Sequence, residues 1–146
     1  MAFYLDRGDG IFLGPQRDTQ VALFSNMAMV HLKPEHFVDA ERTASSCLKL
    51  DPDHGKASYR RSMARLQISR RTPWGDAQRI EQAREDATHC DHGDARNKLL
   101  QRIENESKRI EKIEEEKKRK QKQFCLGFAS AVDSGERSSS APPPVQ

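Results

Sequence analysis

The sequence predicts an all-α protein built as a stack of helix pairs. Apolar side chains recur at helical spacing through most of the first hundred residues, and Val, Ile and Thr never alternate over a sustained window as strands require. The helical pattern also repeats, because a shift of about 34 residues places segment 21–32 on segment 55–66. Helix pairs of one period stack side by side, so we expect an α-solenoid followed by a long C-terminal extension helix.

The length and the charge of the chain limit the classes of protein to which it can belong. The 146 residues suffice for one modest domain, and 25 Lys and Arg stand against 22 Asp and Glu, a net charge of +3. This near balance does not indicate a nucleic-acid surface, which needs a one-sided basic excess. Cys47, Cys90 and Cys125 are scattered, no signal peptide is present, and no apolar run has membrane-spanning length. We expect a reduced cytoplasmic protein, with the nucleus as the alternative, and no membrane span.

The first helix pair is predicted over residues 19–50. Before it, residues 1–20 are rich in glycine and are expected to be an irregular leader, a candidate for the remnant of a first repeat. Pro34 separates the two helices, and Pro52 closes the unit 21–54. The apolar positions at helical spacing are Val21, Phe24, Ala28 and Leu32 in the first helix and Phe37, Ala40, Ala44, Cys47 and Leu48 in the second.

The second unit, 55–92, is predicted to be a looser copy of the first. Its helices are expected at 56–68 and 76–90, and the loop around Trp74 between them is longer than the repeat allows. A charged extension helix follows over 93–124, whose early part should pack on the last repeat as a cap. Residues 125–146 end in a Ser- and Pro-rich run and are expected to be a disordered tail.

The period and several motif positions resemble those of the tetratricopeptide repeat. Small residues at Ala28, Ala40 and Cys47 would let helices approach closely, with bulky Phe24 and Leu32 between them. The stretch "NMAMVHLK…CLKLDPDHGKASYRRSMARL" further resembles the tetratricopeptide domain of the large immunophilins, the FK506-binding and cyclophilin-type prolyl isomerases that act as co-chaperones. Their domain also ends in a long charged helix.

The resemblance implies a partner and a site. In that family a concave groove clamps the acidic C-terminal peptide, ending Glu-Glu-Val-Asp, of the heat-shock chaperones. Asn26, Lys56 and Arg60 stand at three of the five clamp positions. The other two belong to a leading helix for which this sequence has no counterpart, so a partial carboxylate clamp is expected.

The spacing of these residues suits a carboxylate ligand. Lys56 and Arg60 are four residues apart and share one helix face, while Asn26 lies one repeat before the position of Arg60. Arg binds a carboxylate bidentately, Lys acts as a compact charge, and Asn donates an N–H. The apolar residues expected to cover the ligand's aliphatic groups are Tyr59, Met63 and Leu66.

Two other readings of the function remain open. No prolyl isomerase domain is recognisable, so we expect a binding protein and not an enzyme, although a longer gene product would be an isomerase with this chain as its C-terminal piece. The other reading is a helical adaptor that docks its partner on the 99–122 helix. The run "KKRKQK" is interpreted as part of a solvated helix.

Metal, cofactor and catalytic motifs are not indicated. His89, Cys90 and His92 cluster, but no second Cys or His pair stands at zinc-finger spacing. His31 and His36 are interpreted as packing and loop residues. No phosphate-binding loop and no local nucleophile motif occurs. We therefore predict no metal and no cofactor, and the oligomeric state stays open.

Overall fold

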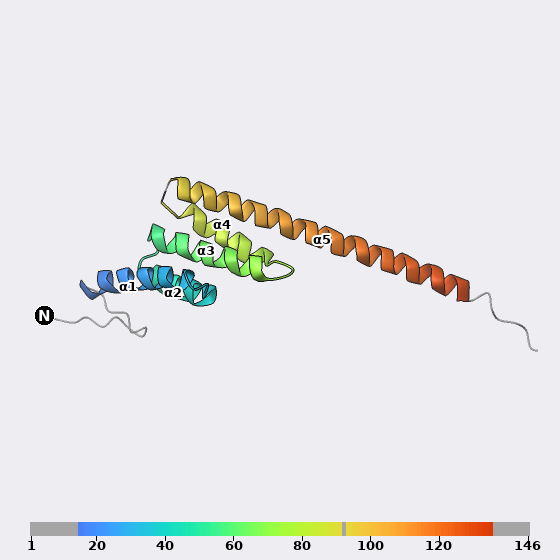
Figure 1. Ribbon diagram of the computed structural model, residues 1–146, viewed down its shortest axis with the longest axis horizontal. Coiled ribbons are helices and arrows are strands. Elements are labelled where there is room, and N and C mark those ends of the chain that lie inside the picture. The colour runs from blue at the N-terminus through green and yellow to red at the C-terminus, as the bar shows by residue number, and fades with distance from the viewer. Residues whose placement is uncertain (1–14, 92, 136–146) are drawn as a thin grey trace, which may run out of the picture. The chain divides into compact units, whose positions relative to one another are not determined.

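The computed structural model describes residues 15–91 and 93–135, which form five α-helices and contain no strand (Figure 1). Consecutive helices up to α4 pack against each other, and α1 also contacts α3. This confirms the predicted all-α helical stack. The helices are α1 (Pro15–Leu32), α2 (Phe37–Leu50), α3 (Gly55–Arg71), α4 (Ala77–Thr88) and α5 (Asp94–Gly135).

Two predicted boundaries are wrong. The leader was expected to be irregular over 1–20, but α1 begins at Pro15, a residue whose fixed φ and missing N–H suit the first position of a helix. The tail was expected to be disordered from 125, but α5 continues to Gly135, since Ala and Leu favour helix in this stretch and the prolines, which stop a helix, come only at 142–144. The rest of both predictions, 1–14 and 136–146, lies outside the described residues.

The helix starts follow from local side chains. His54 caps α3, its Nδ1 accepting from the Ala57 N–H at 3.2 Å. Asp76 caps α4, its carboxylate accepting from the Arg79 N–H at 2.9 Å. Gly75 precedes that cap with φ +73°, a conformation that glycine adopts without strain. The connection between these two helices is shorter than expected, because α3 continues to Arg71 and only residues 72–76 separate it from α4.

The first three helices share two small cores. One joins Val21 of α1 to Cys47 and Leu48 of α2, with Phe24 packed against it. Ala28 and Ala40 are completely buried, and Cys47 is buried with its Sγ donating to the Val21 carbonyl at 3.4 Å. The predicted close approach of the first two helices through small residues is confirmed. The second core joins Phe37 and Ala40 of α2 to Ala64 of α3.

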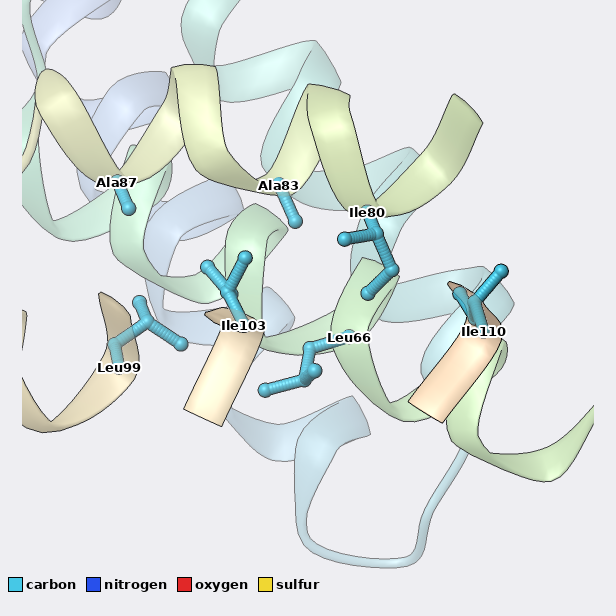
Figure 2. Close-up of a cluster of buried hydrophobic side chains, with 7 residues drawn as sticks. All are labelled: Leu66, Ile80, Ala83, Ala87, Leu99, Ile103 and Ile110. Carbon is cyan, nitrogen blue, oxygen red and sulfur yellow. The ribbon is translucent and has the colours of Figure 1, made fainter. Parts of the chain in front are cut away.

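A third core joins α3, α4 and the first part of α5 (Figure 2). Leu66 comes from α3, and the α5 side chains face it and the α4 side chains across the cluster. The early part of α5 therefore caps the stack, as predicted. The members of this cluster are Leu66, Ile80, Ala83, Ala87, Leu99, Ile103 and Ile110.

Beside this core, α2, α3 and α4 are joined by a cluster of charged side chains. Asp86 of α4 is only 4% exposed and accepts from Arg61 Nε at 2.9 Å and Nη2 at 2.6 Å, and from Arg65 Nη1 at 2.9 Å. Arg65 also donates to Glu41 of α2 at 2.9 Å. One buried carboxylate thus fixes two arginines of α3, and one of these reaches α2.

The chain divides within α5. Residues up to Ile110 form one compact unit, and those from Glu111 form a second. In the second unit, side chains 114–129 are all exposed, which confirms the predicted solvated helix. None of the described helices combines the length and apolar character needed to cross a membrane.

Candidate peptide-binding groove

A cavity of about 460 Å³ lies beside α3 in the first unit, and its size falls in the usual range for ligand sites. Three parts of the chain line it: the end of α1, the start of α3, and the α4–α5 connection with the first turn of α5. The first helix of each helix pair therefore contributes to one groove, together with the start of the capping helix. The lining residues are Met29, Leu32, Lys33, Gly55, Lys56, Tyr59, Arg60, Cys90, Asp91, Ala95 and Arg96.

The lining combines an apolar surface with an excess of positive charge. Met29, Leu32, Tyr59 and Ala95 offer apolar contacts. Among the described residues, the charged ones that line the cavity are the cations Lys33, Lys56, Arg60 and Arg96 and one acid, Asp91. Such a surface favours a ligand that carries more than one negative charge beside aliphatic groups.

Two predicted clamp residues, Lys56 and Arg60, line this groove together with Tyr59. Their side chains differ in exposure and in the hydrogen bonds that they already make within the chain. Lys56 is exposed at the start of α3. Arg60 is half-buried, and its Nη1 donates to both the carbonyl and the hydroxyl of Ser25 on α1. Burial lowers the pKa of the Arg60 guanidinium from its ordinary value, although an arginine stays protonated at neutral pH. Arg60 thus ties α1 to α3 while contributing charge to the groove.

An acid of the chain itself lies at the start of α3. A Cβ built on Gly55 would lie 2.5 Å from Oδ1 and 3.0 Å from Oδ2 of Asp91, so this carboxylate sits directly over the first residue of the helix. The N-terminus of a helix attracts negative charge. Asp91 therefore takes the place beside Lys56 that a ligand carboxylate would also favour.

The other predicted site residues lie elsewhere. Asn26 is exposed on α1, one turn before Met29, and does not line the cavity. Met63 is half-buried against the third core and is likewise outside the lining. Leu66 is completely buried in that core and has no surface to offer a ligand. Its predicted groove contact is wrong: Leu66 lies on nearly the same side of α3 as Tyr59 but about two turns further along, where side chains of α4 and α5 cover it.

Comparison with protein-family models, with curated proteins and with solved structures finds no match for this chain.

Three charged lining residues were not predicted from the sequence: Lys33, Asp91 and Arg96. Lys33 lies four residues after Met29, the spacing that also relates Lys56 to Arg60, but Met29 itself was not predicted to line the site. Arg96 stands near the start of α5 as Lys56 stands near the start of α3. Asp91 gave no signal, because it lies in a turn whose approach to α3 depends on tertiary packing.

The cavity also contains a cysteine. Cys90 is 6% exposed, its Sγ lies 3.3 Å from the Asp86 carbonyl, and burial followed by the nearby Asp86 charge raises the pKa of its thiol to about 11. Such a thiol stays protonated at neutral pH, so Cys90 supplies no thiolate nucleophile there.

Proposed function

We propose that this chain is a non-enzymatic protein-interaction module that binds an acidic C-terminal peptide, in the manner of the immunophilin co-chaperones that its sequence resembles. The observation that carries the proposal is the cavity beside α3, whose lining combines four cations with apolar side chains and includes Lys56 and Arg60. A peptide ending Glu-Glu-Val-Asp offers several carboxylates and one valine side chain, which match these two kinds of surface.

The ligand's terminal carboxylates are assigned to two of the cations that line the groove. Lys56 is exposed and therefore able to turn toward a ligand, and Arg96 contributes a second cation from α5. Arg60 is held by Ser25, so it acts mainly as a fixed positive charge. The valine lies against Tyr59 and Met29. Asn26 is assigned no direct contact with the last residue, because it stands one turn away from the lining.

A fluorescence anisotropy titration with a labelled Glu-Glu-Val-Asp peptide tests the proposal. An exposed ion pair contributes about 0.5–1 kcal/mol, so Lys56→Gln should raise Kd about 2–5-fold and the Lys56→Gln/Arg96→Gln variant about 10-fold. Lys49→Gln is the matched control, because Lys49 is an exposed lysine of α2 outside the lining. A peptide with an amidated C-terminus should bind more weakly than the free acid.

Salt supplies an independent readout. Raising the ionic strength tenfold should weaken the peptide complex of the parental chain markedly and that of the Lys56→Gln/Arg96→Gln variant less, because fewer charge pairs remain to be screened. An affinity that is the same for the double variant, for the control and for the amidated peptide would refute the groove as the binding site.

An adaptor function through α5 is the second candidate. The predicted docking stretch 99–122 is only partly available, because Leu99, Ile103 and Ile110 are buried in the third core. Beyond it, however, Phe124 is 75% and Phe128 66% exposed, next to the basic run. The double substitution Phe124→Ala/Phe128→Ala separates the candidates. If the groove binds the acidic peptide, this variant should bind it with unchanged affinity. A loss of affinity would instead indicate that the peptide binds to α5.

A further inference from the structure

A group of potential metal ligands lies at the turn between α1 and α2, away from every site predicted from the sequence. His31 belongs to the last turn of α1, His36 precedes α2, and Asp39 lies in the first turn of α2. One ligand atom from each of the three lies within 4.8 Å of the other two. The two imidazole rings have centroids 6.4 Å apart and are tilted by 33°.

The backbone of the turn explains why these residues meet. The His36 N–H donates to the His31 carbonyl at 3.0 Å, and Glu35 just before it has φ +65°, which reverses the chain tightly. His36 and Asp39 are three residues apart at a helix start, so their side chains share one face. The turn thus places two imidazoles and one carboxylate on the same side of the α1–α2 hairpin.

The side chain of His36 does not cap α2, the helix that it precedes. His54, at the same position before α3, accepts a hydrogen bond from the Ala57 N–H, whereas His36 makes no side-chain cap bond to α2. Among the described residues, the structure gives His31, His36 and Asp39 no side-chain hydrogen bond or ion pair; the one contact is that between the two rings. Their ring nitrogens and carboxylate oxygens therefore remain available as ligands.

We propose that His31, His36 and Asp39 bind one divalent transition-metal ion, best represented by Zn²⁺. Two imidazole nitrogens and one carboxylate oxygen suit Zn²⁺ and its first-row neighbours, whereas Ca²⁺ and Mg²⁺ prefer oxygen ligands alone. With Zn–N bonds of about 2.0–2.1 Å, tetrahedral ligand atoms lie roughly 3.3 Å apart. His36 and Asp39 are exposed and His31 is half-buried, so all three have room to close the remaining separation by side-chain rotation.

The ion would join the end of α1 to the start of α2. His31 stands between Met29 and Leu32, which both line the groove beside α3. A metal ion at the turn therefore stabilises the hairpin that carries one wall of the groove. Because the described residues provide these histidines with no carboxylate or carbonyl partner for the second ring nitrogen, we expect weaker binding than at a closed structural zinc site. The metal site does not depend on the proposed peptide binding.

Isothermal titration calorimetry of the full chain with Zn²⁺, under a non-chelating reductant, tests the site. The reference chain carries Cys125→Ser, His89→Gln and His92→Gln, which remove other potential ligands. We expect one ion per reference chain, at least a tenfold loss of affinity on His31→Asn or His36→Asn, and a smaller loss on Asp39→Asn. His54→Asn is the matched control, since it removes a histidine while keeping a capping side chain, and it should bind as the reference does.

A spectroscopic readout covers the case in which a histidine variant does not fold. Electron paramagnetic resonance of the Cu²⁺-loaded reference chain should show two imidazole nitrogens bound to one ion. Circular dichroism identifies any variant whose helix content has changed. The absence of Zn²⁺ binding, unchanged affinity in the folded His31→Asn/His36→Asn variant, or a Cu²⁺ spectrum with at most one imidazole would each overturn the proposal.

Discussion

Neutralising the Asp86 carboxylate should lower the stability of the described fold strongly while leaving the shape of the side chain almost unchanged. Its carboxylate is 4% exposed and accepts three charge-assisted hydrogen bonds, two from Arg61 and one from Arg65, at 2.6–2.9 Å. Asp86→Asn keeps the size of the side chain but removes its charge. The amide also turns one acceptor oxygen into an N–H₂ group that faces a guanidinium donor.

The cost follows from how far the partners are buried. Breaking a fully buried ion pair by removing one partner costs about 3–5 kcal/mol, because the other charge stays uncompensated. Here the Arg61 and Arg65 side chains keep 24% and 15% exposure, and Arg65 retains Glu41, so water and Glu41 compensate part of the loss. We expect a destabilisation of about 2–3 kcal/mol. For a domain of this size that corresponds to a fall in Tm of roughly 10–20 °C.

Urea unfolding followed by far-ultraviolet circular dichroism measures this change directly. Glu85→Gln is the control, because it neutralises the neighbouring acid of the same helix, whose side chain is exposed, and should change stability by less than about 0.5 kcal/mol. Equal stabilities of the Asp86→Asn and Glu85→Gln variants would refute the assignment of Asp86 as the anchor of α3.

Four further predictions concern the turn before α4, the cysteines and the groove. Gly75→Ala should destabilise by about 1–3 kcal/mol in urea unfolding, because a Cβ at φ +73° would collide with the Ile110 side chain. Cys125 is exposed and should react quickly with a thiol reagent at pH 8, whereas Cys90 should react only on unfolding. Burial raises the pKa of the Cys90 thiol from 9.0 to about 11, so on raising the pH this thiol ionises earlier in the unfolded chain than in the folded one. The stability that the protonated thiol contributes is therefore complete below pH 9 and should decline between pH 9 and 11. Asp91→Asn should strengthen acidic-peptide binding about 2–5-fold in anisotropy, because it removes a negative charge that lines the cavity; weaker binding would contradict this.

Patterns that repeat along the chain were predictable. The spacing of apolar residues identified the helices, and small residues such as Ala28 and Ala40 identified the close contacts between helices. Both inferences depend on the regular period of the α-helix, which is a local property of the sequence. The capping role of early α5 followed in the same way from Leu99, Ile103 and Ile110. The end of α5 was missed because the Ser- and Pro-rich run near the end of the sequence was taken to mark disorder from residue 125, ahead of the prolines that stop a helix.

Contacts between distant polar side chains were not predictable. Ser25 lies 35 residues from Arg60, and nothing local shows that it accepts from that guanidinium. Asp86 looked like one acid among several on a charged helix, and its burial depends on where α4 rests against α3. For the same reason Leu66 was expected to cover the ligand's aliphatic groups, although packing against α4 and α5 buries it in the third core.

The division of the first unit into three small cores also has a kinetic consequence. Each core joins only two or three neighbouring helices, so most residues in contact are separated by short stretches of sequence. Loop-closure entropy is then small at every step, and folding can begin at one hairpin and spread to the next. Helical proteins with such local contacts fold on the microsecond-to-millisecond timescale. Within the first unit, the end hairpin α1–α2 has neighbours on one side among the described helices, so we expect it to open before the hairpin that α5 caps.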